Sequence, residues 1–265
     1  MNFTNDALIH KNINGTEFIQ FRKLLEFPNV KHCYTLRKNG INIQVKDGDE
    51  TDLIESYKKV ANALNFDYKN IVKPHQTHTD KVEIVSNVNE EFDEIDGVIT
   101  NKKDIFLCTT SADCTSLFFY DDRNKVIGDV HSGWKGTLHK IGKKAVEKMI
   151  KEFDCNPKNI ICCIGPCIKK CHFEVDEDVM KLFQNKFEYT GKINEIIEKG
   201  RKQADKQKYN IDTTLINKII LQETGLLPEN IIDCDICTVC NSDYFHSYRV
   251  DKEKSGRNGA FIGML

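Results

Sequence analysis

Two histidines and one cysteine stand where polar segments meet predicted strands. His78 ends a polar turn, Cys114 begins a predicted strand and His131 ends another. Two imidazoles and one thiolate form a three-ligand zinc set, and a fourth position left open distinguishes a catalytic zinc site from a structural one. Such a zinc ion activates water at neutral pH. His78, Cys114 and His131 are far apart in the sequence, which also fits two hydrogen-bonded core histidines and a buried thiol. Both interpretations, the metal site and the structural one, stay open.

A second group of cysteines has the spacing Cys234-x2-Cys237-x2-Cys240. It begins like an iron–sulfur run, but the bacterial pattern continues with x3-Cys-Pro. Tyr244 and Phe245 stand in those places. We therefore expect these three cysteines to be structural thiols that hold no metal.

A third group, Cys167-x3-Cys171-His172, follows a Gly-Pro turn. It would ligate a metal only with help from elsewhere in the chain, and we expect a turn with incidental cysteines. The chain has 11 cysteines. In a protein of this size from a reducing compartment, they indicate thiols, metal ligands or a nucleophile rather than a disulfide framework.

A glycine-rich turn follows His131 and includes Gly133 and Gly136. Beyond it, apolar residues at i, i+3 and i+4 spacing predict a helix over 138–153. Glycine permits close backbone approach to a ligand, and a helix start offers free N–H groups to an anion. An ordinary tight turn explains the same residues, and we expect Trp134 to pack the turn rather than to stack on a ligand.

The hydrophobic pattern predicts an α/β (α+β) fold with mixed sheets in the centre and helices packed outside. Strands are expected over 32–36, 81–85, 97–100, 105–109, 116–120, 126–131, 160–164, 231–239, 244–250 and 260–265. Helices are expected over 53–64, 138–153, 175–187, 192–207 and 211–225, and an acidic loop over 47–52. No repeat or linker interrupts the sequence, so we expect a single compact domain over residues 1–265.

Composition narrows the function classes. The chain has 38 basic and 40 acidic residues, a net charge of −2 and 40% hydrophobic residues. This balance gives no reason to expect nucleic acid or an anionic membrane as a partner. Residues 1–11 lack the pattern of a signal peptide, and no apolar run approaches the ~18 residues of a membrane span. We therefore expect a cytoplasmic protein.

Several motifs, in order along about residues 31–265, resemble the YfiH/YlmD family of laccase-domain proteins, once called polyphenol oxidases and now regarded as purine nucleoside phosphorylases. The most specific matches are Gln76-Thr77-His78, Ala112-Asp113-Cys114 and the run from Val130 to Thr137. Supporting matches are Ile164-Gly165-Pro166, Phe173-Glu174-Val175, Ile236-Cys237-Thr238, Ser247-Tyr248-Arg249 and Gly256-Arg257.

The resemblance implies zinc ligands at His78, Cys114 and His131. It implies phosphorolysis of adenosine, inosine and S-methyl-5'-thioadenosine, hydrolytic deamination of adenosine, and purine nucleosides and phosphate as partners. Deamination also needs a group that moves protons. Asp113 and Asp129 are the acids nearest to the ligands in sequence, and the sequence assigns this role to neither.

Phosphorolysis needs a phosphate held in line with the ribose C1′. Under the resemblance, Arg37, Ser132, Lys135 and Arg249 are the expected phosphate- or substrate-binding residues. Arg37 matches the arginine that ends the family's first strand. Arg249 matches the first of a paired Arg-Arg whose second member is Val250 here.

Other functions fit the same residues. Two histidines and a cysteine also suit a copper site of a phenol oxidase, although none of the four methionines lies near the ligand motifs in sequence. Cys114 with His131 also forms a nucleophile and base for a cysteine hydrolase. A non-enzymatic binding or assembly factor is a further class. The sequence leaves the oligomeric state open between monomer and homodimer.

Overall fold

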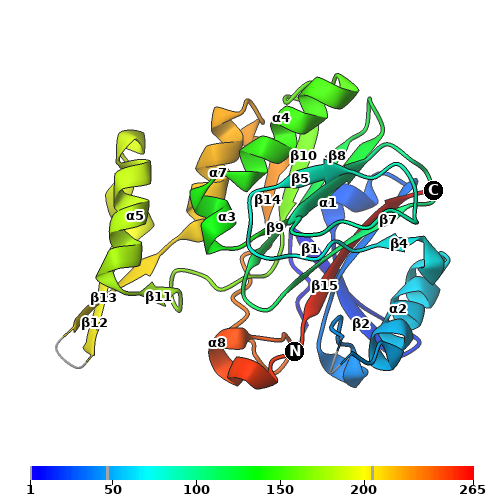
Figure 1. Ribbon diagram of the computed structural model, residues 1–265, viewed down its shortest axis with the longest axis horizontal. Coiled ribbons are helices and arrows are strands. Elements are labelled where there is room, and N and C mark those ends of the chain that lie inside the picture. Colours follow the sequence, from blue (N-terminus) through cyan, green and yellow to red (C-terminus); the bar gives the residue numbers. More distant parts are fainter. Residues whose placement is uncertain (1, 46–47, 204–205) are drawn as a thin grey trace.

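The computed structural model describes residues 2–45, 48–203 and 206–265 and shows a mixed α/β fold (Figure 1). The first sheet has the strand order β1 (Leu8–Ile13), β2 (Thr16–Phe21), β3 (Val30–Thr35), β15 (Asn258–Met264), β7 (Phe106–Ser111) and β4 (Ile71–Val72). The second has the order β14 (Ile231–Asp233), β10 (Ile160–Ile164), β8 (Thr115–Asp121), β9 (Val126–Ser132), β6 (Gly97–Thr100) and β5 (Val82–Ile84). A smaller third sheet has the order β11 (Glu174–Val175), β13 (Lys206–Ile211) and β12 (Ile197–Gln203).

The helices in the described part of the chain are α1 (Arg22–Leu25), α2 (Thr51–Leu64), α3 (Trp134–Leu138), α4 (Ile141–Phe153), α5 (Glu177–Phe187), α6 (Ile193–Ile196), α7 (Thr213–Glu223) and α8 (Tyr248–Asp251). Of these, α2 packs on the outer face of the first sheet, and α4 and α7 pack on the outer face of the second. Figure 1 shows α4 and α7 on one side of the sheets and α2 on the other. No helix in the described part of the chain is both long enough and apolar enough to span a membrane.

The layers follow from the alternation of side chains along each strand. On β8, Phe118 and Tyr120 pack into the core between the two large sheets, whereas Leu117 and Phe119 pack into the core beneath α4 and α7. Successive side chains of a strand point to opposite faces, so a strand that is buried along its whole length, as β8 is, serves both cores. The expected fold class, with mixed sheets in the centre and helices outside, is confirmed.

The third sheet and α5 form an arm at one end of the molecule (Figure 1). Phe183 and Phe187 of α5 share an apolar cluster with Ile211 of β13 and Ile216 of α7. Strand β11 of this arm follows the 165–173 loop, which reaches the candidate site described below.

Two element predictions are wrong. The segment 192–207 was expected to be helical because it is rich in Glu and Lys, which are good helix formers. Instead, α6 ends at Ile196 and the chain forms the β12–β13 hairpin, in which Ile197 pairs with Ile211; positions 204–205 lie outside the described residues. Likewise, 244–250 was expected to be a strand, but Tyr248 and Val250 are exposed and the Ser247 side chain caps α8. Tertiary contacts override local propensity in both segments.

Other boundaries also differ from the expected ones. The strand expected over 231–239 ends at Asp233, and the N-terminal strands β1 and β2 were not predicted. The helix expected over 138–153 is divided, because Lys140 has a positive φ of 59° between α3 and α4. Part of the acidic loop expected over 47–52 is helical, since α2 begins at Thr51; position 47 lies outside the described residues.

Candidate metal centre

His78, Cys114 and His131 converge at one end of the second sheet. One side-chain ligand atom from each lies within 4.8 Å of the others. Cys114 Sγ is 3.7 Å from His78 Nε2, and the two imidazole rings lie 4.9 Å apart at 82°. Neighbouring strands β8 and β9 hold two of these residues, since Cys114 directly precedes β8 and His131 lies in β9. Adjacent strands therefore bring together residues that are far apart in sequence.

A buried carboxylate, Asp96, positions both histidines. Its Oδ1 lies 2.7 Å from His131 Nδ1 and also accepts from the His78 backbone N–H at 3.1 Å. Its Oδ2 accepts from the Thr77 and Thr79 backbone N–H groups and from the Thr79 hydroxyl. Burial opposes ionisation, but the hydrogen bond and charge of His131, together with the two Thr79 donors, outweigh it and lower the pKa of Asp96 to about 2. Because Asp96 occupies Nδ1 of His131, the free nitrogen of that ring is Nε2.

Asp96 is a candidate positioning residue that the sequence did not reveal. It lies 18 residues from His78 and 35 from His131, so no local motif links them. The only sequence signal is an acidic residue placed directly before the apolar strand β6. A carboxylate that orients a metal-binding histidine is a recurrent feature of metal sites.

The two acids nearest in sequence have structural roles instead. Asp113 accepts hydrogen bonds from the hydroxyls of Thr238 and Ser247. Asp129 is fully buried, and its two oxygens accept from the backbone N–H and the hydroxyl of Thr109. Burial raises the pKa of Asp129 to about 8. The hydrogen-bonding capacity of both carboxylates is thus used within the fold.

Cys114 and His131 form an electrostatic pair. Burial would raise the pKa of the Cys114 thiol, but the charge of His131 and hydrogen bonds from both histidines lower it to about 6. Burial would lower the pKa of His131, but the Cys114 thiolate and Asp96 raise it to about 9. The thiolate is the form of cysteine that binds metals and acts as a nucleophile.

In the turn after His131, Gly133 lies too close to the side chains of His78, Cys114 and His131 to carry a side chain of its own. A Cβ atom added to Gly133 would lie 2.8 Å from His78 Cδ2 and 3.4 Å from both Cys114 Sγ and His131 Cε1. The sequence predicted that the backbone of this turn approaches a bound molecule closely. In the structure it approaches the three candidate metal-binding side chains. Helix α3, which follows the turn, has only five residues.

We expect Gly133→Ala to weaken metal binding about 10-fold or more, because the new methyl group displaces the exposed His78 ring. The fold should be retained, since the side chain that must move lies at the surface. Metal affinity, measured by competition with a chromophoric chelator, and the melting temperature check this. Gly165→Ala is the matched control, because its added Cβ would meet nothing closer than 3.4 Å. Equal metal affinity of the two variants would contradict the prediction.

A cavity of about 430 Å³ opens beside the three ligand residues. It is lined by Gln76, His78, Thr110, Ser111, Ala112, Asp113, Cys114, Thr115, His131, Ser132, Trp134, Ile168, Phe173, Thr213, Tyr248, Arg249 and Arg257. Small-molecule sites are commonly cavities of this size that combine apolar walls with a few polar groups. Trp134 lines this cavity and also packs against the apolar cluster around α5.

The expected phosphate-binding residues divide into two pairs. Ser132 and Arg249 line the cavity, whereas Arg37 and Lys135 are not among its described lining residues. Lys135 is exposed, with its Nζ 5.7 Å from the centre of the Trp134 ring. Arg37 donates to the Asp251 carboxylate at 2.9 Å, so it ties α8 to the first sheet.

Two arginines present their side chains at the cavity. Arg249 donates from Nη1 to the His172 carbonyl at 2.8 Å and from Nη2 to the Glu174 carbonyl at 3.3 Å. Arg257, which sequence reasoning did not place in the site, donates from Nη1 to the Ser255 and Gly256 carbonyls. Each guanidinium has five N–H groups, so both keep donors for an anion.

Comparisons with known proteins show which family this chain resembles. Residues 31–265 match the family model described as multi-copper polyphenol oxidoreductase laccase. The chain is 31% identical over 234 residues to purine nucleoside phosphorylase YlmD of Bacillus subtilis, covering 85% of this chain and 81% of that protein. It is 31% identical over 269 residues to a Staphylococcus epidermidis protein named purine nucleoside phosphorylase, covering 95% and 97%.

Solved structures give the same result for the fold. The crystal structure of the hypothetical protein YfiH of Bacillus licheniformis superposes with a TM-score of 0.85 at 25% identity, covering 97% of this chain and 99% of that one. The structure of YlmD from Geobacillus stearothermophilus also gives a TM-score of 0.85, at 23% identity and 98% and 99% coverage. The chain therefore belongs to the YfiH/YlmD family, whose model is described as multi-copper polyphenol oxidoreductase laccase and whose curated relatives are named purine nucleoside phosphorylases.

Proposed function

We propose that this protein is a zinc-dependent purine nucleoside enzyme. It cleaves adenosine, inosine and S-methyl-5'-thioadenosine with phosphate, and it deaminates adenosine to inosine with water. The observation that carries the proposal is one cavity of about 430 Å³ that holds the His78–Cys114–His131 group together with two arginines. The names of the relatives, which are purine nucleoside phosphorylases, support the phosphorolysis part of this proposal.

The donor set suits zinc. His78 Nε2, Cys114 Sγ and His131 Nε2 would hold the ion, and three protein ligands facing an open cavity are typical of catalytic zinc. Bound there, zinc supplies a Lewis acid and activates water at neutral pH. Asp96 keeps His131 in the tautomer that leaves Nε2 free, as carboxylates do for other metal-binding histidines.

Phosphorolysis forms a bond between a phosphate oxygen and C1′ of the ribose and breaks the bond from C1′ to N9 of the purine. The bonding electrons leave with the base, which takes up a proton. Arg249 and Arg257 hold and orient the phosphate, because guanidinium groups match phosphate oxygens in geometry and charge. Aromatic side chains of Trp134, Phe173 and Tyr248 form walls that suit a planar base. These residues bind and align the two reactants.

The direct test is adenosine with and without phosphate, followed by separation of the products. Inosine formed without phosphate demonstrates deamination, and free adenine with ribose 1-phosphate, formed only with phosphate, demonstrates phosphorolysis. Absence of both products from metal-loaded protein would contradict the proposal.

Replacing Arg249 with alanine should affect the two reactions unequally. Losing a charge-assisted contact to phosphate costs about 1.5–3 kcal/mol, which is roughly 10- to 100-fold in the rate of phosphorolysis. Deamination uses no phosphate and should fall much less, and Arg249→Lys should recover only part of the loss. The measurement is the ratio of adenine to inosine in saturating phosphate, with the exposed Arg123→Ala as control. An unchanged ratio in Arg249→Ala would show that Arg249 does not hold the phosphate.

The geometry also favours a second function, a cysteine hydrolase. Asp96, His131 and Cys114 are linked in the order of an orienting acid, a base and a nucleophile, as such hydrolases require. A covalent acyl-enzyme trapped on Cys114 in metal-free, active protein would establish this function. Activity that depends on zinc would exclude it.

A further inference from the structure

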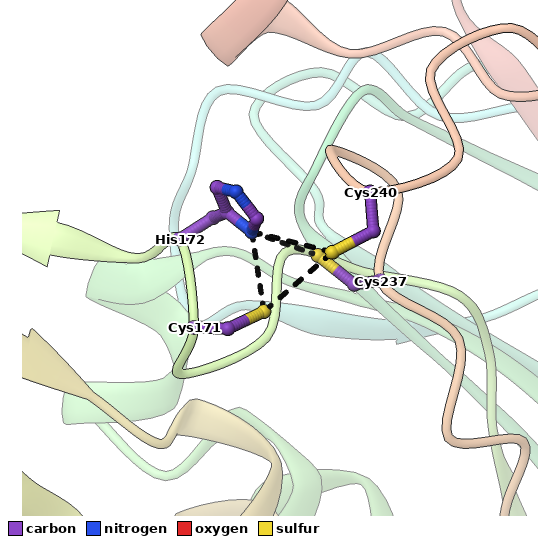
Figure 2. A group of neighbouring side chains, drawn as sticks. All are labelled: Cys171, His172, Cys237 and Cys240. Atoms are coloured by element: carbon purple, nitrogen blue, oxygen red, sulfur yellow. Dashed lines mark hydrogen bonds between the residues drawn. The ribbon is translucent and has the colours of Figure 1, made fainter.

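A second group of metal-ligating side chains lies apart from the first, on the 165–173 loop and the turn after β14. Figure 2 shows Cys171, His172, Cys237 and Cys240 pointing toward one another. One ligand atom from each lies within 4.8 Å of the others. The sequence spacing had placed Cys171 and His172 in one motif and Cys237 and Cys240 in another. Cys234, which the spacing had joined to Cys237 and Cys240, is instead buried in the core between the sheets.

Three sulfur atoms surround a single imidazole nitrogen. His172 Nδ1 is 3.2 Å from Cys171 Sγ, 3.4 Å from Cys240 Sγ and 3.7 Å from Cys237 Sγ. A neutral imidazole nitrogen has one lone pair and accepts one hydrogen bond, and a thiol is a weak donor. Hydrogen bonding therefore accounts for one of the three contacts and leaves the other two without a physical reason.

A metal ion at the centre accounts for all of them. Zinc bonds of about 2.3 Å to sulfur and about 2.0–2.1 Å to nitrogen, in a tetrahedron, place two sulfurs about 3.8 Å apart and a nitrogen and a sulfur about 3.6 Å apart. The Cys171 and Cys240 sulfurs lie 3.9 Å apart, and the three nitrogen–sulfur distances bracket the expected value. Three sulfurs and one nitrogen in a tetrahedron favour zinc among the common metals.

The backbone holds the two ligand segments in register. Cys167 and Cys237 form a parallel β-bridge, and the Thr238 N–H donates to the Cys167 carbonyl at 3.0 Å. The Asn210 side chain donates to the Lys170 carbonyl, which fixes the loop next to Cys171. The ligands are thus placed by contacts that do not involve their own side chains, so the site is built before a metal binds.

We propose that Cys171, His172, Cys237 and Cys240 bind a structural zinc ion, in addition to the metal at the first site. Four protein ligands close the coordination shell, which is typical of a structural rather than a catalytic zinc. The proposal replaces our expectation from spacing alone that Cys237 and Cys240 hold no metal and that Cys171 and His172 are incidental.

The position of this site gives the ion a structural task. The carbonyl of His172 accepts from Arg249 Nη1, and Ile168 and Phe173 of the same loop line the cavity. A zinc ion that joins this loop to the 237–240 turn would fix the wall of the cavity and the orientation of Arg249. It would do so without contact with the substrate.

Metal content of protein purified under reducing conditions tests the proposal. We expect about two zinc ions per chain in the wild type, about one in Cys114→Ala, about one in Cys240→Ser and none in the double variant, because each site is lost separately. Cys155→Ser, which changes a thiol outside both groups, should keep both ions. Wild-type protein with a single zinc that disappears entirely in Cys114→Ala would overturn the proposal.

Cobalt(II) provides a second measurement that does not depend on the stability of one variant. Cobalt-loaded Cys114→Ala should show the absorption bands of tetrahedral thiolate coordination, and these bands should vanish when Cys171→Ser or Cys240→Ser is added. Lack of these bands in folded, reduced Cys114→Ala would contradict the proposal. Neither readout uses nucleosides, so failure here leaves the proposed function untouched, and failure of the nucleoside assay leaves this site untouched.

Discussion

Cys114→Ala should remove the metal from the first site and lower both phosphorolysis and deamination by about 1000-fold or more. The variant leaves two histidines, which is fewer than the three protein ligands of catalytic zinc sites. Loss of a Lewis acid removes several kcal/mol of transition-state stabilisation, and about 4 kcal/mol corresponds to roughly 1000-fold in rate. Zinc content and the rates of adenine and inosine formation are measured together.

The control for this variant is Cys155→Ser, whose thiol belongs to neither ligand group. The fold of Cys114→Ala should persist, because Cys114 is only half-buried and lies at the end of a sheet. Its thermal unfolding should therefore remain cooperative. Full occupancy of the first site in Cys114→Ala, or full activity without metal, would contradict the ligand assignment.

Asp96→Asn should weaken metal binding and activity by about 10- to 100-fold, the usual effect of changing a group that orients a ligand. The amide nitrogen of the asparagine cannot accept from the backbone N–H groups of residues 77–79. The uncharged side chain also no longer stabilises a charged His131. Both histidines therefore lose their fixed orientation, although neither ligand atom is removed. The decisive readout is metal affinity, because a purely structural loss would lower stability without changing the affinity of the folded protein.

Asp93→Asn is the matched control for Asp96→Asn. Asp93 also pairs with a histidine, since its Oδ1 lies 2.6 Å from His75 Nδ1, but this pair is exposed. Exposed ion pairs contribute about 0–1 kcal/mol, so this variant should keep wild-type metal affinity. If Asp93→Asn and Asp96→Asn bind zinc equally well, Asp96 does not position the ligands.

Strongly patterned segments could be predicted from the sequence, and segments that depend on distant partners could not. The apolar run of β8 and the glycine turn after His131 indicated their structures correctly, because local pattern and tertiary packing agree there. The β12–β13 hairpin was missed because its charged sequence favours a helix when isolated. In the structure, the Gln207 side chain donates to the Gly200 carbonyl of β12 and the Asn210 side chain donates to the Lys170 carbonyl of the 165–173 loop. The second of these partners is not visible in a local pattern.

The candidate site shows the same division. The first ligand set could be proposed from residue types at predicted strand ends, and the structure brings these three residues together. Asp96 could not be identified, because it reaches His131 across 35 residues of chain. The sequence placed Cys171 and His172 in one motif and Cys237 and Cys240 in another, whereas the structure makes these four side chains neighbours. Cys171 and Cys240 meet across 69 residues of chain, and Cys234 is buried in the core.

Measuring which metal the protein binds would distinguish a zinc enzyme from the copper oxidase that the description of the family model suggests. A blue-copper site uses two histidines, a cysteine and a weak axial methionine. No methionine is among the described residues that line the cavity, and zinc therefore remains the metal that we propose.

The most direct test of the account is phosphorolysis of adenosine by wild-type protein that has been stripped of metal and reloaded. We expect that adenine formation in the presence of phosphate is lost on chelation and is restored by zinc but not by copper. We also expect that zinc does not restore adenine formation in Cys114→Ala. Undiminished phosphorolysis by metal-free wild-type protein, or its restoration by copper alone, would contradict the account.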